Sequence, residues 1–239
     1  MRLAIHIILL CVSLNAFGNT DSLFLAGNQH YQNEAYEKAI ESYFAIDSSQ
    51  HAHALYHNLG NCYYQTGNIP RSILFYEKAL LLKKDKQTIE NLKIAKKRIQ
   101  EIEPIPTLFF IRWWKSLAGL WSTNSWLAIF AVFVWINSFL FFSFLKNRKK
   151  GTFNLFLVVT TLTLLLGAVA QKSNTLAKEQ YAIVMEKTAL LSNISDSKSD
   201  FLIPAGNKIL LLEFSNKLTF IKLPNGRVGW IVRNSSQEL

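Results

Sequence analysis

The sequence has few of the residue patterns on which enzymes and disulfide-bonded domains depend. It contains two cysteines, Cys11 and Cys62, in 239 residues. Cys11 lies in a segment that we expect to be removed, so the mature chain would keep one thiol and could form no internal disulfide. No nucleophile–base pair, metal-ligand set, phosphate-binding loop or pair of carboxylates emerges from the spacing of the polar residues. The sequence therefore argues against an enzyme, and we expect neither a cofactor nor a metal.

Acidic residues are scarce relative to basic ones. The chain has 16 Asp and Glu against 26 Lys and Arg, a formal net charge of +10. A basic excess can indicate a nucleic-acid-binding protein. Here four positive charges fall within residues 146–152, and much of the rest is scattered or sits in one helical stretch. Because no nucleic-acid-binding motif accompanies these charges, we expect no nucleic-acid partner.

Two long apolar runs stand out in the second half of the chain. Trp126–Leu145 has 20 residues without a charge, and Phe153–Ala170 has 18. A helix needs about 20 apolar residues to cross the hydrocarbon core of a bilayer, and neither run has the polar face of a surface helix. The pattern predicts a transmembrane hairpin; two buried helices of a soluble protein are the alternative. The basic loop 146–152 should stay in the cytoplasm, which places both flanks outside.

The first 18 residues have the pattern of a secretory signal peptide. Arg2 supplies the positive charge, Leu3–Leu14 is apolar, and residues 16–18 have the small–x–small pattern of a cleavage site. An uncleaved anchor helix is the alternative. Export would place the chain from Asn19 onward outside the cytoplasm, in agreement with the orientation that the basic loop predicts.

Residues 20–103 contain an internal repeat with a period of 33 residues. The recurring pairs are Gly27 and Gly60, Tyr31 and Tyr64, Ile40 and Ile73, and Tyr43 and Tyr76. This arrangement resembles the tetratricopeptide repeat, a helix–turn–helix unit with a period near 34 in which the glycine allows close helix approach. The following stretch, Lys86–Glu103, has apolar residues at helical spacing. It predicts a capping helix that shields the last repeat.

The resemblance implies that the first helix of each repeat lines a concave face that binds a partner. Matching to the family places these side chains there: Phe24, Asn28, Tyr31, Gln32, Asn58, Asn61, Tyr64, Gln65 and Arg98. Some members of the family clamp a peptide carboxylate at the places of Asn28 and Asn58, but Phe24 and Asn91 replace the cations of that clamp. Side-chain amides can pair with a peptide backbone. We therefore expect a partner-binding groove, with a merely solvated groove as the alternative.

Three histidines raise the question of a metal site. His53 and His57 could share a helical face, and His51 is near. Zinc normally takes three or four ligands, and neither Asp47 nor Cys62 has the spacing to join that face. We therefore expect no metal site, and we expect Cys62 to be a packed core residue.

Residues 104–125 predict a linker followed by an interfacial helix. Pro104 and Pro106 should end the capping helix. The next stretch is rich in Phe, Leu and Trp around Arg112 and Lys115. Because Trp favours the boundary between lipid and water, we expect a helix that leads into the first span. A protein-binding patch is the alternative.

From residue 180 to residue 235 the apolar pattern becomes that of short strands. The expected strands are Tyr181–Met185, Ala189–Leu191, Lys208–Phe214 and Leu218–Leu223, with turns at 204–207 and 224–226. The Gly-Trp-Ile stretch around Trp230 resembles bacterial SH3-like domains, which implies a small all-β barrel. Such modules are proposed to bind wall peptides, so Trp230 is a possible ligand site, although Leu218 replaces a Trp of the usual pocket. A plain stabilising domain is the alternative.

The order of signal peptide, tetratricopeptide repeats, membrane hairpin and SH3-like domain resembles the BatE family of the Bacteroides aerotolerance (Bat) operon. The resemblance implies a partnership with membrane-tethered von Willebrand A domain proteins and a MoxR-type ATPase, and a role in envelope integrity and tolerance of oxygen or oxidative stress. We expect a multidomain inner-membrane scaffold with two spans, whose repeats and C-terminal domain lie in the periplasm. A peptidoglycan-binding anchor or envelope sensor that acts through the SH3-like domain is the alternative.

Overall fold

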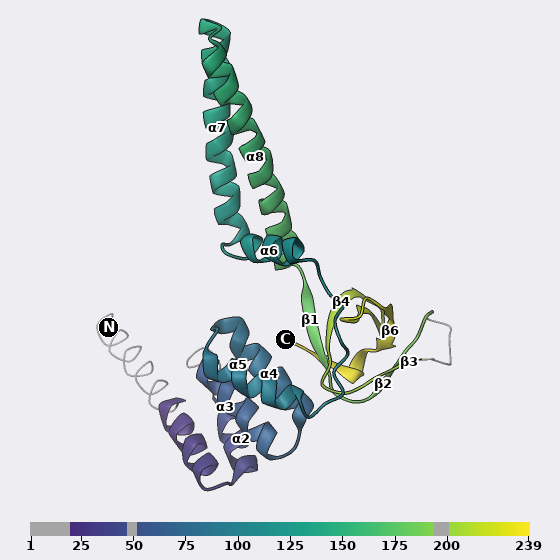
Figure 1. Ribbon diagram of the computed structural model, residues 1–239. Helices are drawn as coiled ribbons and strands as arrows, with labels where there is room; N and C mark the ends of the chain where they lie inside the picture. The colour runs from purple at the N-terminus through teal and green to yellow at the C-terminus, as the bar shows by residue number, and fades with distance from the viewer. Residues whose placement is uncertain (1–19, 47–51, 194–200) are drawn as a thin grey trace, which may run out of the picture. The chain divides into compact units, whose positions relative to one another are not determined.

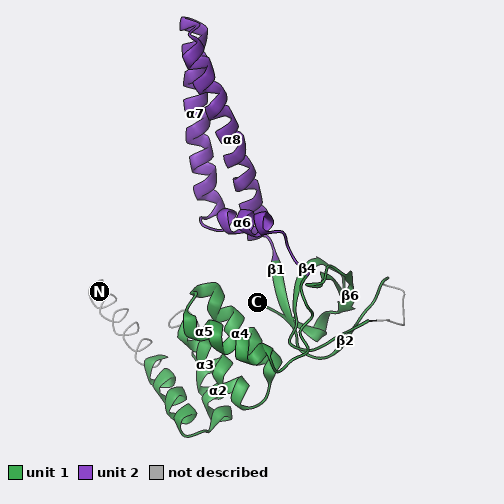
Figure 2. Ribbon diagram, in the orientation of Figure 1, with its two compact units in different colours: residues 1–104, 180–239 green, residues 105–179 purple. Residues whose placement is uncertain are grey.

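The computed structural model describes residues 20–46, 52–193 and 201–239. The expected signal peptide and His51 lie outside these residues. The chain forms two units, which Figure 2 colours separately. The first unit combines the residues up to Pro104 with Gln180–Leu239, and the second is Ile105–Glu179. The second unit is therefore an insertion within the first.

Helices make up the first part of unit 1. The first described helix covers residues 20–32. Those that follow are α2 (Tyr36–Phe44), α3 (Ala52–Gln65), α4 (Ile69–Leu82) and α5 (Lys86–Lys96), as Figure 1 shows. Asn68 begins α4 and Asp85 begins α5, each accepting a hydrogen bond from a main-chain N–H in the first turn. These side chains satisfy donors that the start of a helix leaves unpaired.

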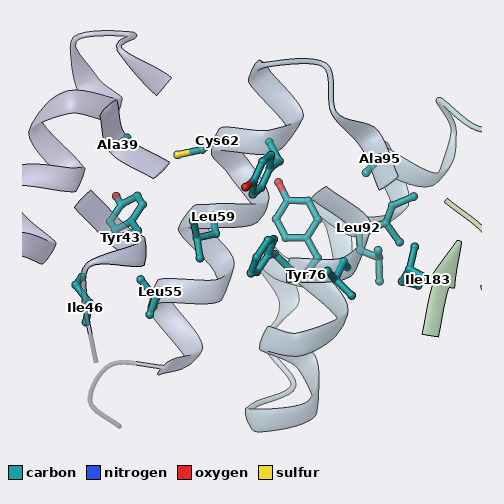
Figure 3. Packing of buried hydrophobic residues seen from close by; sticks show 14 residues of the cluster. Ala39, Tyr43, Ile46, Leu55, Leu59, Cys62, Tyr76, Leu92, Ala95 and Ile183 are labelled. Carbon is teal, nitrogen blue, oxygen red and sulfur yellow. The ribbon is translucent and has the colours of Figure 1, made fainter. Parts of the chain in front are cut away.

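The repeated glycines lie where paired helices touch. A Cβ atom at Gly60 would lie 2.5 Å from the ring of Tyr76, and one at Gly27 would lie 2.5 Å from the ring of Tyr43. Only a residue without a side chain fits there, as the sequence predicts. Cys62 is fully buried in the same core, shown in Figure 3, and burial raises the pKa of its thiol to about 12.

Helix α5 ends earlier than the sequence predicts. It stops at Lys96 instead of continuing to Glu103. The residues that follow run along the sheet instead: the N–H of Ile102 donates to Oδ1 of Asn207 at 2.7 Å, and the Ile102 side chain belongs to the core of the sheet. The expectation of a helix up to Pro104 was wrong because a distant partner, rather than helical spacing, decides the path of these residues.

The C-terminal part of unit 1 is an antiparallel sheet of five strands in the order β6-β5-β4-β1-β7, with a separate pair β2-β3. The bounds are β1 (Gln180–Val184), β2 (Thr188–Leu190), β3 (Phe201–Ile203), β4 (Lys208–Phe214), β5 (Leu218–Lys222), β6 (Val228–Val232) and β7 (Ser236–Glu238), with a 3-10 turn at Arg233–Ser235. The four strands expected before Pro224 are present within about a residue, whereas β3 and β7 were not predicted.

The repeats and the sheet pack against each other. The nearly buried carboxylate of Glu77 in α4 receives the amino groups of Lys96 at 3.2 Å and of Lys208 in β4 at 2.6 Å. Asn207 also donates to the carbonyl of Gln100 at 2.9 Å. Ile183 of β1 lies in the same apolar cluster as the repeat core. The two parts therefore share buried contacts, although 75 residues of the second unit separate them in the sequence.

Unit 2 consists of α6 (Phe109–Ala118), α7 (Thr123–Asn147) and α8 (Lys150–Ala177). Helices α7 and α8 lie side by side, with α6 across their base (Figure 1). Both long helices are long and apolar enough to cross a membrane, and they extend beyond the apolar runs that the sequence marks. At the base, Trp126 Nε1 donates to the carbonyl of Ala118 at 3.2 Å, while Phe109 and Trp113 remain exposed.

The contact at Gly60 leads to a stability prediction. Gly60→Ala should lower the free energy of unfolding by about 1–3 kcal/mol, because the added methyl group overlaps the buried ring of Tyr76. Gly151→Ala is the control, since apart from the adjacent residues and the backbone of its own helix, no described atom lies within 4 Å of the added carbon. Denaturant unfolding of the purified full chain, followed by circular dichroism, provides the measurement. Equal midpoints for the two variants would contradict the packing.

Candidate functional site

Two adjoining hollows lie on one side of the repeat helices. The larger has a volume of about 370 Å³ and the smaller about 150 Å³. The larger is lined by Tyr31, Asn61, Tyr64, Gln65, Tyr76, Gln87, Asn91 and Ile94. The smaller is lined by Asn28, Tyr31, Gln32, Tyr43, Asn58 and Asn61. Because both contain Tyr31 and Asn61, they form one continuous surface, called the groove below.

The groove brings together seven of the nine side chains that the resemblance places on the concave face; Phe24 and Arg98 are not among its lining. Asn28, Tyr31, Gln32, Asn58, Asn61, Tyr64 and Gln65 all line it. Phe24 does not line either hollow; its ring packs 5.8 Å from that of Tyr43. Arg98 places its guanidinium 5.7 Å from the ring centre of Tyr64. The lining residues Gln87 and Ile94 of α5 were missed, although the 33-residue period continues into that helix.

The smaller hollow is built around a hydrogen-bonded set of three residues. Oδ1 of Asn28 accepts from the hydroxyl of Tyr43 at 2.7 Å and from Nδ2 of Asn58 at 3.0 Å. The three residues come from the first described helix, α2 and α3. The set therefore ties one repeat to the next.

The larger hollow repeats this set one period later. Oδ1 of Asn61 accepts from the hydroxyl of Tyr76 at 2.7 Å and from Nδ2 of Asn91 at 3.0 Å. Each of these residues lies 33 positions after its counterpart in the first set. Asn91, which the sequence presents only as a missing cation, thus has the same role as Asn58.

Burial keeps both tyrosines in the form that donates a hydrogen bond. It raises the pKa of Tyr43 to about 12, and it raises the pKa of Tyr76 as well. Both hydroxyls therefore remain protonated near neutral pH and hold the carbonyls of Asn28 and Asn61 inward.

The same arrangement leaves polar groups for a ligand. Among the described residues, Nδ2 of Asn28 and of Asn61 has no acceptor, and Oδ1 of Asn58 and of Asn91 has no donor. An N–H donor and a carbonyl acceptor in each set are the groups that pair with a main-chain amide. Each set can therefore pair with a main-chain amide of an extended segment that lies in the groove.

The histidines connect helices. His53 Nε2 lies 2.8 Å from Oδ2 of Asp85, and His57 Nδ1 lies 2.7 Å from the hydroxyl of Thr88. Thr88 in turn donates to Asp85 at 2.5 Å. Burial lowers the pKa of His57. These bonds attach α3 to the start of α5, and within the described parts of the chain no three His, Cys, Asp or Glu residues could hold a metal ion together.

Trp230 lies on β6, in the sheet. Its ring is 5.0 Å from that of Phe220 on the neighbouring strand β5. Its main chain exchanges two hydrogen bonds of 2.8 Å with Leu191. Both rings are partly exposed, so they form an aromatic surface that is separate from the lining of the groove.

Comparison with known proteins supports the assignment of the helices. The family model of the tetratricopeptide repeat matches residues 53–86, which cover nearly all of α3 and all of α4. No curated protein matches the chain. The match confirms a tetratricopeptide repeat in the part of the chain that supplies Asn58, Asn61, Tyr64 and Gln65 to the groove.

Asp85 leads to a prediction on pH and stability. Burial acts to raise the pKa of this carboxyl, but hydrogen bonds from Thr88 and His53 outweigh it and hold the pKa well below its usual value. The charge therefore stabilises the fold above the unfolded pKa of about 3.9, and this contribution is lost as the pH falls through the folded pKa. Asp85→Ala, which removes the helix cap as well, should cost about 0.5–2 kcal/mol near pH 7.

Urea unfolding at several pH values provides the test. Asp85→Asn is the matched variant, because Asn can still cap α5 but carries no charge. Its deficit relative to the natural protein should be present near pH 7 and should shrink as the pH falls below about 4. A deficit that stays constant into strong acid would show that the charge of Asp85 is not its source.

Proposed function

We propose that the protein is a membrane-anchored scaffold whose groove holds an extended segment of a partner protein. The observation that carries this proposal is the Asn–Tyr set, which occurs twice; within the described residues, each set has one amide N–H and one amide carbonyl without a partner. The tetratricopeptide match supports a role in protein–protein interaction. Tyr31 and Tyr64 add apolar area beside these polar groups.

The anchoring rests on the helical hairpin. Helices α7 and α8 have the length and composition of membrane spans. The repeats and the sheet contact each other through Glu77 and Lys208, so both belong on the same side of a membrane, and the chain between them crosses an even number of times. The positive residues at positions 146–150 favour a cytoplasmic turn and a periplasmic location for unit 1. An exported N-terminus agrees with this orientation.

The partner follows from the resemblance of the whole arrangement to the BatE family. On this proposal, the groove binds a segment of a membrane-tethered von Willebrand A domain protein, in a complex that includes a MoxR-type ATPase. The hairpin would hold this complex at the inner membrane, where it supports envelope integrity and tolerance of oxygen.

A second candidate function concerns the sheet. Its five antiparallel strands and its Phe220–Trp230 pair are compatible with an SH3-like module. Partly exposed aromatic rings with an apolar face can stack on a sugar or a wall peptide, so this surface favours binding to peptidoglycan. The protein would then be a wall anchor or an envelope sensor.

The topology can be tested with single cysteines in a Cys11→Ser, Cys62→Ala background. Lys38→Cys on the repeats and Lys222→Cys on the sheet are both exposed, and both should react with an impermeant thiol reagent in intact spheroplasts. Gly151→Cys at the helical turn should react only after permeabilisation. Labelling of Gly151→Cys alone would reverse the orientation, and labelling of all three would show that the hairpin does not cross.

The groove needs variants that remove ligand contacts without removing internal ones. Asn28, Asn58 and Asn61 are unsuitable because they also bond neighbouring helices. A triple Ala variant of Gln32, Gln65 and Gln87 removes lining side chains that make no hydrogen bond among the described residues. If each contributes one bond worth about 0.5–1.5 kcal/mol, binding should weaken by roughly tenfold or more.

The measurement is co-purification from solubilised membranes, quantified for von Willebrand A domain proteins. Lys38→Ala with Glu41→Ala, both exposed on α2 and outside the groove lining, is the control pair. If the triple variant retains every partner while Trp230→Ala loses binding to murein sacculi, the wall-binding function replaces the scaffold.

A further inference from the structure

An amide in the middle of the apolar hairpin is not fully satisfied by the hairpin itself. Asn137 on α7 lies within the apolar run, about 12 Å from its end at Leu145 at 1.5 Å per residue. The hydroxyl of Thr160 on α8 lies 3.1 Å from Oδ1 of Asn137. The same hydroxyl lies 2.7 Å from the carbonyl of Phe156 in its own helix. Thr160 therefore has one proton for two acceptors.

A count of hydrogens shows what is missing. An Asn side chain has two N–H donors and a carbonyl that can accept twice. As the amide is placed, its carbonyl faces Thr160 and neither N–H has an acceptor within the described chain. With the amide reversed, one N–H can donate to Thr160, whose proton serves Phe156. At least one N–H of Asn137 therefore has no acceptor among the described residues in either orientation.

This unpaired donor lies at the surface of the hairpin. Among the described residues, no buried side-chain nitrogen or oxygen lacks a partner, so Nδ2 of Asn137 is accessible. Nearby hydroxyls differ, because each can donate to a carbonyl of its own helix: Ser138 to Val134 at 2.9 Å, and Thr163 to Val159 at 2.7 Å. In a bilayer core no water replaces the missing acceptor, which makes an unpaired N–H unfavourable.

We propose that Asn137 joins two copies of this chain within the membrane, with the N–H of each Asn137 donating to the carbonyl of the other. The inference rests on the proposed membrane crossing of α7 and α8. A twofold axis presents the same residue from both sides, and an amide carries both a donor and an acceptor. With the amide reversed, so that its other N–H donates to Thr160, one mutual contact satisfies both copies. Another protein would need a polar residue of its own at the same depth.

Pairing has a consequence for the groove. Two copies joined through α7 present two grooves at one membrane surface. A partner with two binding segments, or a pair of membrane-tethered partners, would then bind with an effective concentration set by the dimer.

The test uses the full chain in vesicles of phosphatidylethanolamine and phosphatidylglycerol. Donor- and acceptor-labelled copies are mixed, and energy transfer is followed as the lipid content is raised. Asn137→Val should raise the apparent dissociation constant by about three- to thirtyfold. Ser138→Ala, at the next residue, should leave it unchanged. Asn137→Gln, which keeps an amide, should preserve most of the energy transfer.

Thr160→Val distinguishes pairing of two copies from a contact between α7 and α8 within one copy. It removes the same interhelical bond as Asn137→Val but leaves the amide for the second copy, so energy transfer should persist. An equal loss in both variants would show that Asn137 only holds α7 to α8 and would overturn the proposal. The proposal would also be overturned if the natural chain showed no energy transfer at any lipid content.

Crosslinking provides a second, geometric measurement. Val134→Cys lies one turn before Asn137 on a neighbouring face, whereas Phe139→Cys lies on the opposite, strongly exposed face. In a background without other cysteines, oxidation in membranes should crosslink the first and not the second. The reverse pattern would contradict the interface. Because the topology labelling is independent, a chain that crosses the membrane as a monomer overturns the pairing alone.

Discussion

Asn207 joins segments of the chain that lie 105 residues or more apart, and the architecture depends on this residue. Its side chain accepts from the N–H of Ile102 and donates to the carbonyl of Gln100. The side chain of Asn207 is buried, so leaving its polar atoms unpaired would be costly. Through these bonds the residues after α5 lie along the sheet, and the side chain of Ile102 packs in the core of the sheet. The chain leaves the first unit at Pro104, two residues after Ile102.

The ion pairs of Glu77 reinforce the junction from the repeat side. A nearly buried carboxylate is tolerated where cations and hydrogen bonds compensate for lost hydration; here Lys96 comes from α5 and Lys208 from the sheet. The sheet thus packs on the end of the repeats and covers apolar surface that a terminal repeat would otherwise expose. One consequence is that the groove and the Phe220–Trp230 surface belong to a single unit.

The two asparagines of each set in the groove, Asn28 with Asn58 and Asn61 with Asn91, bond to each other with one amide group and leave the other amide group for a ligand. The bonds to Tyr43 and Tyr76 hold the amides in one orientation before any partner arrives, and such preorganisation reduces the entropy lost on binding. Substitution of Asn28 or Asn61 should therefore affect both stability and binding, because it removes an internal hydrogen-bond acceptor as well as a ligand contact. Asn137 in the hairpin shares this division, with one side toward Thr160 and an unpaired donor at the surface.

The repeat, the two apolar helices and most of the strands could be predicted from the amino-acid sequence, because each depends on a local period. The 33-residue period also brought Asn28 and Asn61 to equivalent places, so the groove could be predicted from a repeat with known spacing. Three features depend on contacts between distant residues and could not be predicted: α5 stops at Lys96, β7 pairs with β1, and Glu77 contacts Lys208. A period records which way a side chain faces along its own element. It does not show which distant residue will pack against that side chain. Buried polar contacts, such as that of Glu77 with Lys208, depend on those distant partners.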